Sequence, residues 1–211
     1  MKKWVEHGHS NVEFECSRTK PNIFLIGDSI RQGYCKTVKE SLSDVAEVFY
    51  FSDNCRSTQY GVFNMKGWAG KFDDPALVDI VHFNFGHWDV AHFNGVELSL
   101  TSLEEYGRNM NVLVELIKRF FPNAKLVFAT STPMNPDRLN KVDTNPRSDE
   151  ELDAYNRVAV EIMQKHEVAV SDLNAYMRGW GTECFSDACH LTPAAFAALG
   201  EEVARRLRSF I

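Results

Sequence analysis

The chain has 211 residues, of which 44% are hydrophobic, so it can bury one sizeable core, and no Ser/Gly/Pro-rich linker divides it. Its formal net charge is −6 and its basic residues are scattered apart from a short C-terminal cluster, so we expect no nucleic-acid partner. Five cysteines form no Cys-x-x-Cys pair, and no segment is apolar over the length of a signal peptide or a bilayer span. We therefore expect a cytoplasmic protein with no membrane partner. It is interpreted as a single domain over residues 1–211, with residues 1–20 as an N-terminal extension and its oligomeric state left open.

Apolar runs of strand type alternate with helical patterns along the chain, and this alternation predicts a parallel sheet covered by helices. Strands are expected at 22–26, 46–51, 80–85, 125–130 and 168–172. Helices are expected at 32–41, 102–120, 149–166 and 193–210. Two of the helix starts carry capping boxes, Thr101-x-x-Glu104 and Ser148-x-x-Glu151. The predicted fold class is α/β, a three-layer α/β/α sandwich around a five-stranded parallel sheet.

Three long segments follow the second, third and fourth expected strands and are interpreted as loops. They cover residues 52–71, 86–100 and 132–148, and the last of them contains three prolines. Loops of this length in a compact domain are usually functional or mobile. We expect them to supply the walls of a pocket and a lid.

Two short motifs at opposite ends of the chain contain the groups that a serine hydrolase needs. Gly27-Asp28-Ser29 follows the first expected strand, so Ser29 lies at a strand's carboxyl end, where open α/β sheets place their ligand sites. Asp187-Ala188-Cys189-His190 precedes Thr192-Pro193, which is a strong signal for the start of the last helix. A serine hydroxyl needs an imidazole to take its proton and a carboxylate to orient that imidazole. The motifs therefore favour a nucleophilic Ser29 over the alternative in which Ser29 only caps a helix.

These motifs resemble those of the SGNH or GDSL-type serine esterases and lipases, and the similarity runs from about Asn22 to the C-terminus. That family has Gly-Asp-Ser after the first strand, a glycine-bearing loop after the second, Gly-x-Asn-Asp after the third and Asp-x-x-His before the last helix. The first and last of these blocks match the chain. The resemblance implies a flavodoxin-like fold and no cofactor or metal. It also implies that Ser29 is the nucleophile and one backbone oxyanion donor, that His190 is the general base and then acid, and that Asp187 is the partner of His190.

The two middle blocks depart from the family pattern at the oxyanion hole. After the second strand, residues 53–58 have no glycine, although a backbone N–H near Arg56 remains a candidate donor. In Gly86-His87-Trp88-Asp89, Trp88 stands where the family has its oxyanion asparagine. Asn84 is the favoured substitute, because it has the same amide chemistry and lies on the same face of the expected strand as Gly86. The oxyanion candidates are therefore Ser29, Arg56, Asn84 and Trp88.

Histidines and aromatic residues also gather around the third block. His82, His87, Asp89 and His92 form the cluster that could suggest a metal, but a strand would place His82 and His87 on opposite faces, so histidines that line a pocket are favoured. Cys189 is interpreted as a small buried thiol. Flat apolar side chains suit sugar rings and short acyl groups, and Trp88, His87 and Trp180 are the candidate substrate-binding residues.

The sequence thus predicts a serine ester hydrolase that acts on a small-molecule, O-acylated substrate through an acyl-enzyme. An acetylated carbohydrate is favoured over a lipid or aryl ester. One alternative is a non-catalytic ligand-binding or scaffold protein that keeps the fold. Another is a metal-dependent hydrolase built on His82, His87, Asp89 and His92.

Overall fold

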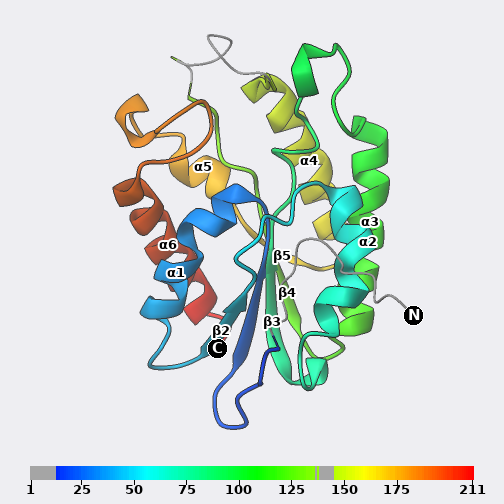
Figure 1. The fold of residues 1–211 in the computed structure, drawn as a ribbon, viewed down its shortest axis with the longest axis vertical. Helices are drawn as coiled ribbons and strands as arrows, with labels where there is room; N and C mark the ends of the chain where they lie inside the picture. The colour runs from blue at the N-terminus through cyan, green and yellow to red at the C-terminus, as the bar shows by residue number, and fades with distance from the viewer. Residues whose placement is uncertain (1–12, 136, 138–144) are drawn as a thin grey trace, which may run out of the picture.

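Five parallel strands, separated along the chain by helices, form one sheet (Figure 1). The computed structural model describes residues 13–135, 137 and 145–211. The strands are β1 (Asn22–Ile26), β2 (Glu47–Tyr50), β3 (Val78–Phe83), β4 (Lys125–Ala129) and β5 (Ala169–Ser171). Their spatial order is β2-β1-β3-β4-β5. The chain therefore reverses its direction across the sheet between β1 and β3, and the carboxyl ends of these two strands flank the crevice where open α/β sheets bind ligands.

The α-helices of the described residues cover both faces of the sheet (Figure 1). One face carries α1 (Ser29–Ser41), α5 (Leu173–Met177) and α6 (Pro193–Arg208), and the other carries α2 (Thr58–Ala69), α3 (Leu103–Phe120) and α4 (Asp149–Lys165). Short 3-10 turns lie at Pro75–Leu77, Phe93–Gly95 and Thr182–Cys184. The predicted α/β/α sandwich with a flavodoxin-like strand order is confirmed.

Two apolar layers hold the helices on the sheet, because successive strand residues point to opposite faces. Phe24, Phe83 and Phe128 are buried on the side of α2, α3 and α4. Leu25 and Val127 are buried on the side of α1 and α6. Phe14, which belongs to the predicted N-terminal extension, packs into the first layer: its ring centroid lies 5.0 to 6.3 Å from those of Phe24, Phe49, Phe51 and Phe72.

Side-chain caps set the starts of the helices. Asp28 caps α1, and its Oδ1 accepts a hydrogen bond from the Ile30 N–H at 2.9 Å, so α1 begins three residues earlier than predicted. Ser148 caps α4 as predicted. The capping box of α3 is Ser102 with Glu105, not Thr101 with Glu104. That prediction was wrong by one residue because the buried Thr101 donates its backbone N–H to the Asp89 carbonyl, and the chain enters the helix only afterwards.

The structure contains two helices that pattern analysis missed. The expected loop 52–71 holds α2, whose apolar and polar residues are poorly separated around the helix and which contains Gly61 and Gly67. The other is α5, a single short turn after β5.

β3 lies two residues earlier than predicted, so Asn84 comes directly after the strand instead of within it. Within the described residues, no helix is both long and apolar enough to cross a bilayer.

Candidate active site

Ser29 lies at the turn that joins β1 to α1. The strand ends at Ile26, Asp28 caps the helix, and Ser29 is the first helical residue. The backbone N–H groups of a first helical turn have no partner within the helix, and they carry its partial positive charge. Ser29 thus stands half-buried at the positive end of α1, at the carboxyl edge of the sheet.

His190 and Asp187 lie on a tight loop before α6 that is closed by a backbone bridge between Phe185 and Leu191. Oδ1 of Asp187 accepts hydrogen bonds from the backbone N–H groups of Cys189, at 2.9 Å, and His190, at 2.7 Å. Partial burial raises the pKa of Asp187, but these two backbone bonds, together with the bond and the charge of the His190 side chain, hold the pKa below its usual value. The loop therefore presents a fixed carboxylate.

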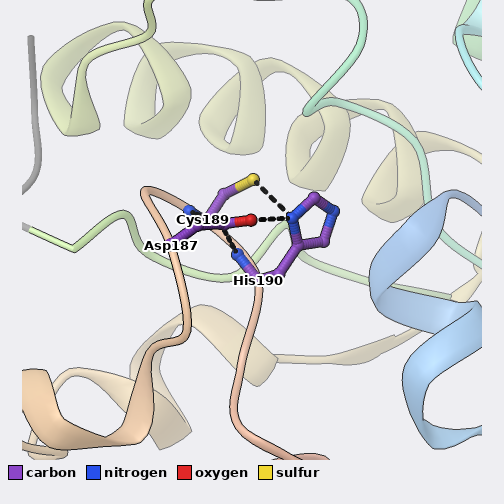
Figure 2. Close-up of side chains that lie close together, drawn as sticks. All are labelled: Asp187, Cys189 and His190. Carbon is purple, nitrogen blue, oxygen red and sulfur yellow. Dashed lines mark hydrogen bonds and ion pairs between the residues drawn. The ribbon is translucent and has the colours of Figure 1, made fainter. Parts of the chain in front are cut away.

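The three predicted residues are joined by two short hydrogen bonds. Nδ1 of His190 lies 2.7 Å from Oδ2 of Asp187 (Figure 2 shows these two residues with Cys189), and Nε2 lies 2.7 Å from Oγ of Ser29. Because a carboxylate can only accept, the His190 proton belongs on Nδ1, which leaves Nε2 to accept from the serine hydroxyl. Residues that are 161 positions apart in the chain thus form a continuous relay.

Asn84 packs against the turn that carries Ser29. A Cβ atom placed on Gly27 would lie 1.9 Å from Oδ1 of Asn84, so the close approach of these residues requires glycine. Asn84 is buried, and its Oδ1 has no hydrogen-bond partner among the described residues. The backbone N–H of Asn84 donates to the Ile26 carbonyl at 3.1 Å, which ties the ends of β1 and β3 together.

Arg56 and Trp88 belong to a partly exposed cluster at the same edge. The Arg56 guanidinium lies 4.9 Å from the ring centroid of Tyr60 and 5.8 Å from that of Trp88, and Trp88 packs on Phe93 at 5.5 Å. The backbone of Arg56 has a positive φ of 55°, and its N–H donates to Oδ1 of Asn54 at 2.7 Å. An oxyanion could use that N–H only by displacing Asn54.

The other two candidate substrate residues are placed differently. His87 is buried, its Nε2 lies 3.3 Å from Oγ1 of Thr132, and burial lowers its pKa to about 4, so it is neutral near pH 7. Trp180 follows α5, stacks edge-on against Tyr176 at 5.5 Å and packs on the core of the α1/α6 face. Among the described residues, neither side chain forms a hydrogen bond with Ser29, His190 or Asp187, although the charge of His190 is one of the lesser influences that lower the pKa of His87.

Asp89 organises the loops around the site. Its carboxylate is buried and accepts hydrogen bonds from the backbone N–H of Thr58, at 3.1 Å, and from the Thr58 hydroxyl, at 2.5 Å. Burial raises the pKa of Asp89 to about 6, although the bonds from Thr58 oppose the rise. Because Thr58 opens α2, Asp89 joins that helix to the end of β3.

The histidine cluster that could have held a metal does not converge. His82 faces the α1/α6 core beside Tyr34, whereas His92 bonds Glu151 on α4 at 2.9 Å. Within the described parts of the chain, the residues that bring three potential metal-ligand atoms within 4.8 Å of one another are Asp187, Cys189 and His190 (Figure 2).

Sequence reasoning missed one residue that supports the His190 loop. The Asn135 backbone N–H donates to the Ala188 carbonyl at 2.9 Å, so the segment after β4 holds the loop between Asp187 and His190. A single asparagine among prolines gave no signal of this role. The rest of the proposed lid lies largely outside the described residues, although Nε of Arg147 donates to the His87 carbonyl at 2.6 Å.

Comparisons with known proteins agree with this geometry. The GDSL-like Lipase/Acylhydrolase family model matches residues 25–198. A GDSL esterase/lipase of Arabidopsis thaliana is 27% identical over 218 residues, covering 88% of this chain and 85% of that protein. The GDSL esterase/lipase WDL1 of Oryza sativa subsp. japonica is 29% identical over 142 residues, or 64% of this chain, and the chain spans only 54% of that relative's length.

A solved structure with the same fold is Est24, a carbohydrate acetylesterase from Sinorhizobium meliloti. It superimposes with a TM-score of 0.70 at 14% identity and covers 91% of this chain and 100% of its own. At that identity the likeness shows the fold alone, whereas the family match covers most of the chain. The chain belongs to the GDSL-like lipase/acylhydrolase family of carboxylic ester hydrolases.

Proposed function

We propose that the protein hydrolyses a small O-acylated substrate through an acyl-enzyme formed on Ser29. The observation that carries the proposal is the unbroken relay from Oγ of Ser29 through the His190 imidazole to Oδ2 of Asp187, with both bonds at 2.7 Å. A helix-capping serine needs no such relay. In α1 the capping role belongs to Asp28, which leaves the Ser29 hydroxyl for chemistry.

In the first half of the reaction, Oγ of Ser29 attacks the ester carbonyl while its proton moves to Nε2 of His190. Asp187 stabilises the resulting imidazolium through Nδ1. The tetrahedral intermediate collapses, Nε2 returns the proton to the departing alcohol, and the acyl group stays on Ser29. In the second half, water gives a proton to Nε2 and attacks the acyl-enzyme, which releases the carboxylic acid and restores the serine hydroxyl.

The oxyanion of both intermediates needs hydrogen-bond donors at the carboxyl edge of the sheet. The Ser29 backbone N–H opens α1 and supplies one of them. Asn84 supplies the second through Nδ2, because its side chain lies against the turn before Ser29 and its other polar atom, Oδ1, is packed against Gly27. Trp88 is already held between Phe93 and Arg56 and suits a wall of the substrate site better.

An acetyl ester of a carbohydrate fits this site best as a substrate. The half-exposed ring of Trp88 offers a flat face to a sugar, as such rings commonly do. The fold is shared with a carbohydrate acetylesterase, which supports the choice without deciding it. Acetate release from acetylated sugars, compared with release from long-chain and aryl esters, measures the preference.

The first test uses p-nitrophenyl acetate and a fluorophosphonate probe. Wild type should turn over the ester and take up the probe at Ser29, as located by peptide mass spectrometry. Ser29→Ala should lose both properties. Ser43→Ala, which removes an exposed serine just beyond α1, should keep both. A wild-type protein that neither hydrolyses acetyl esters nor reacts with the probe would instead be a ligand-binding or scaffold member of the family.

A further inference from the structure

The thiol of Cys189 lies beside the proposed relay and has no part in the mechanism above. Its Sγ lies 3.7 Å from Nδ1 of His190, which is the nitrogen that also bonds Asp187 (Figure 2). Cys189 is buried, whereas the side chain of Asp187 is 53% exposed and that of His190 is 39% exposed. Three different ligand types thus meet at a point that solvent can reach.

We propose that Asp187, Cys189 and His190 form a binding site for Zn²⁺ that switches the hydrolase off. The ligand atoms are Oδ2, Sγ and Nδ1, which lie within 4.8 Å of one another. Carboxylate, thiolate and imidazole are the ligands that Zn²⁺ takes in proteins, and three of them with an open fourth position is a common arrangement. The carboxylate and the thiolate together balance the two charges of the ion.

The two ligand distances that involve Nδ1 need little adjustment to accept the ion. Zn–S and Zn–N bonds of about 2.3 and 2.0 Å in a tetrahedron place the ligand atoms roughly 3.5 Å apart. The distance between Sγ and Nδ1 is already 3.7 Å, whereas Oδ2 and Nδ1, now 2.7 Å apart, must separate by less than about 1 Å. The two backbone bonds to Oδ1 keep the carboxylate in place while Oδ2 exchanges the imidazole for the metal.

A metal ion in this site would prevent His190 from acting as the general base. The inhibitory part of the proposal therefore rests on the proposed function, in which His190 is that base. Binding takes the proton from the Cys189 thiol and releases it to solvent, and the imidazole proton must leave Nδ1 for Nε2. Nε2 then donates to Ser29 instead of accepting from it. The metal thereby fixes the tautomer that cannot activate the serine, without touching Ser29.

The test measures binding and inhibition separately. Co²⁺, used as a spectroscopic substitute for Zn²⁺, should produce an intense near-ultraviolet thiolate-to-metal absorption in wild type and equally in inactive Ser29→Ala. Cys189→Ser should lack this absorption. In parallel, ZnCl₂ should inhibit acetyl ester hydrolysis by wild type, and EDTA should restore it.

The inhibitory concentration of Zn²⁺, measured against each variant's own metal-free rate, should rise about 10-fold or more in Cys189→Ser, since even losing an outer partner of a ligand weakens metal affinity by about 10- to 100-fold. Cys184→Ser is the matched control, because Cys184 is a half-exposed cysteine at the other end of the same loop, and it should behave as wild type. Equal inhibition of wild type and Cys189→Ser, or a wild-type Co²⁺ spectrum without thiolate absorption, would overturn the site. A thiolate–Co²⁺ spectrum in a protein that hydrolyses no ester would support the metal site and refute the proposed hydrolysis.

Discussion

At the scale of single residues, Asp187 has two separable functions in the site. Oδ1 fixes the loop through two backbone bonds, and Oδ2 orients His190. Asp187→Asn can keep the first function, with its side-chain oxygen accepting both N–H groups. Its NH₂ group would then donate to Nδ1 and force the imidazole proton onto Nε2.

We therefore expect Asp187→Asn to keep the circular dichroism spectrum and melting temperature close to those of wild type while kcat falls by about 1,000-fold or more. Steady-state kinetics on p-nitrophenyl acetate measure the loss. A variant with near-wild-type kcat would show that His190 is oriented by another group.

The oxyanion donor is a second question at this scale, and two substitutions decide between its candidates. Asn84→Ala should lower kcat by about 100-fold or more with little change in KM, because the donor acts mainly on the transition state. Trp88→Phe keeps a ring and removes the indole N–H, so it should chiefly change the preference among acyl esters. The reverse pair of results would assign the role to Trp88, and two small effects would leave the oxyanion to backbone N–H groups.

A site residue could be predicted from the sequence where it lies in a recognisable local motif. Ser29, Asp187 and His190 stand in short motifs next to strong element boundaries, so the sequence alone indicated that they belong together. The contacts of Asn135, Thr58 and Cys189 depend on how loops from different strands meet. No local sequence pattern predicts how these loops pack together, so the contacts become visible only in the structure.

At the scale of elements, the capping box of helix α3 allows the contribution of a side-chain cap to stability to be measured. Ser102 accepts a bond from the Glu105 N–H, and Glu105 returns one to the Ser102 N–H, each at 3.3 Å. Ser102→Ala should lower the free energy of unfolding by about 1 kcal/mol, whereas Ser102→Asn, which can also cap, should lower it by much less. Urea denaturation measures both values, and equal losses would contradict the capping assignment.

The elements that were predicted correctly share strong periodicity or strong caps. β1 was predicted to the residue because it is a fully buried run between Pro21 and Gly27. The start of α4 was predicted correctly because Ser148 caps it, whereas its end lies at Lys165, one residue before the predicted end. By contrast, α2 packs against α3 on one side and against Phe51 and the segment after β3 on others, so its apolar residues do not form one stripe. Its N-cap, Ser57, is the local signal that could have revealed it.

At the scale of the whole molecule, buried titratable groups set how stability depends on pH. Burial lowers the pKa of His82 to about 3 and that of His87 to about 4, both from 6.5. The unfolded chain therefore binds protons on these residues between about pH 6.5 and 4 while the folded chain does not, so stability is lost as the pH falls through this range. Asp89, with its pKa raised from 3.8 to about 6, acts in the opposite sense, because the folded chain binds its proton first.

The combined contribution of His82, His87 and Asp89 is a net loss of roughly one proton between pH 6 and 4, which corresponds to about 1.4 kcal/mol of unfolding free energy per pH unit from these three groups. His82→Leu removes one of the two histidines from a site where neither ring nitrogen has a partner among the described residues. Its unfolding free energy should be at least as high as that of wild type at pH 7.5 and should fall less steeply toward pH 5, by about one proton. Asp89→Asn should show the opposite change, a steeper fall. Denaturant titrations at four or five pH values give these slopes, and coincident profiles for wild type and His82→Leu would mean that His82 does not stay neutral in the folded protein.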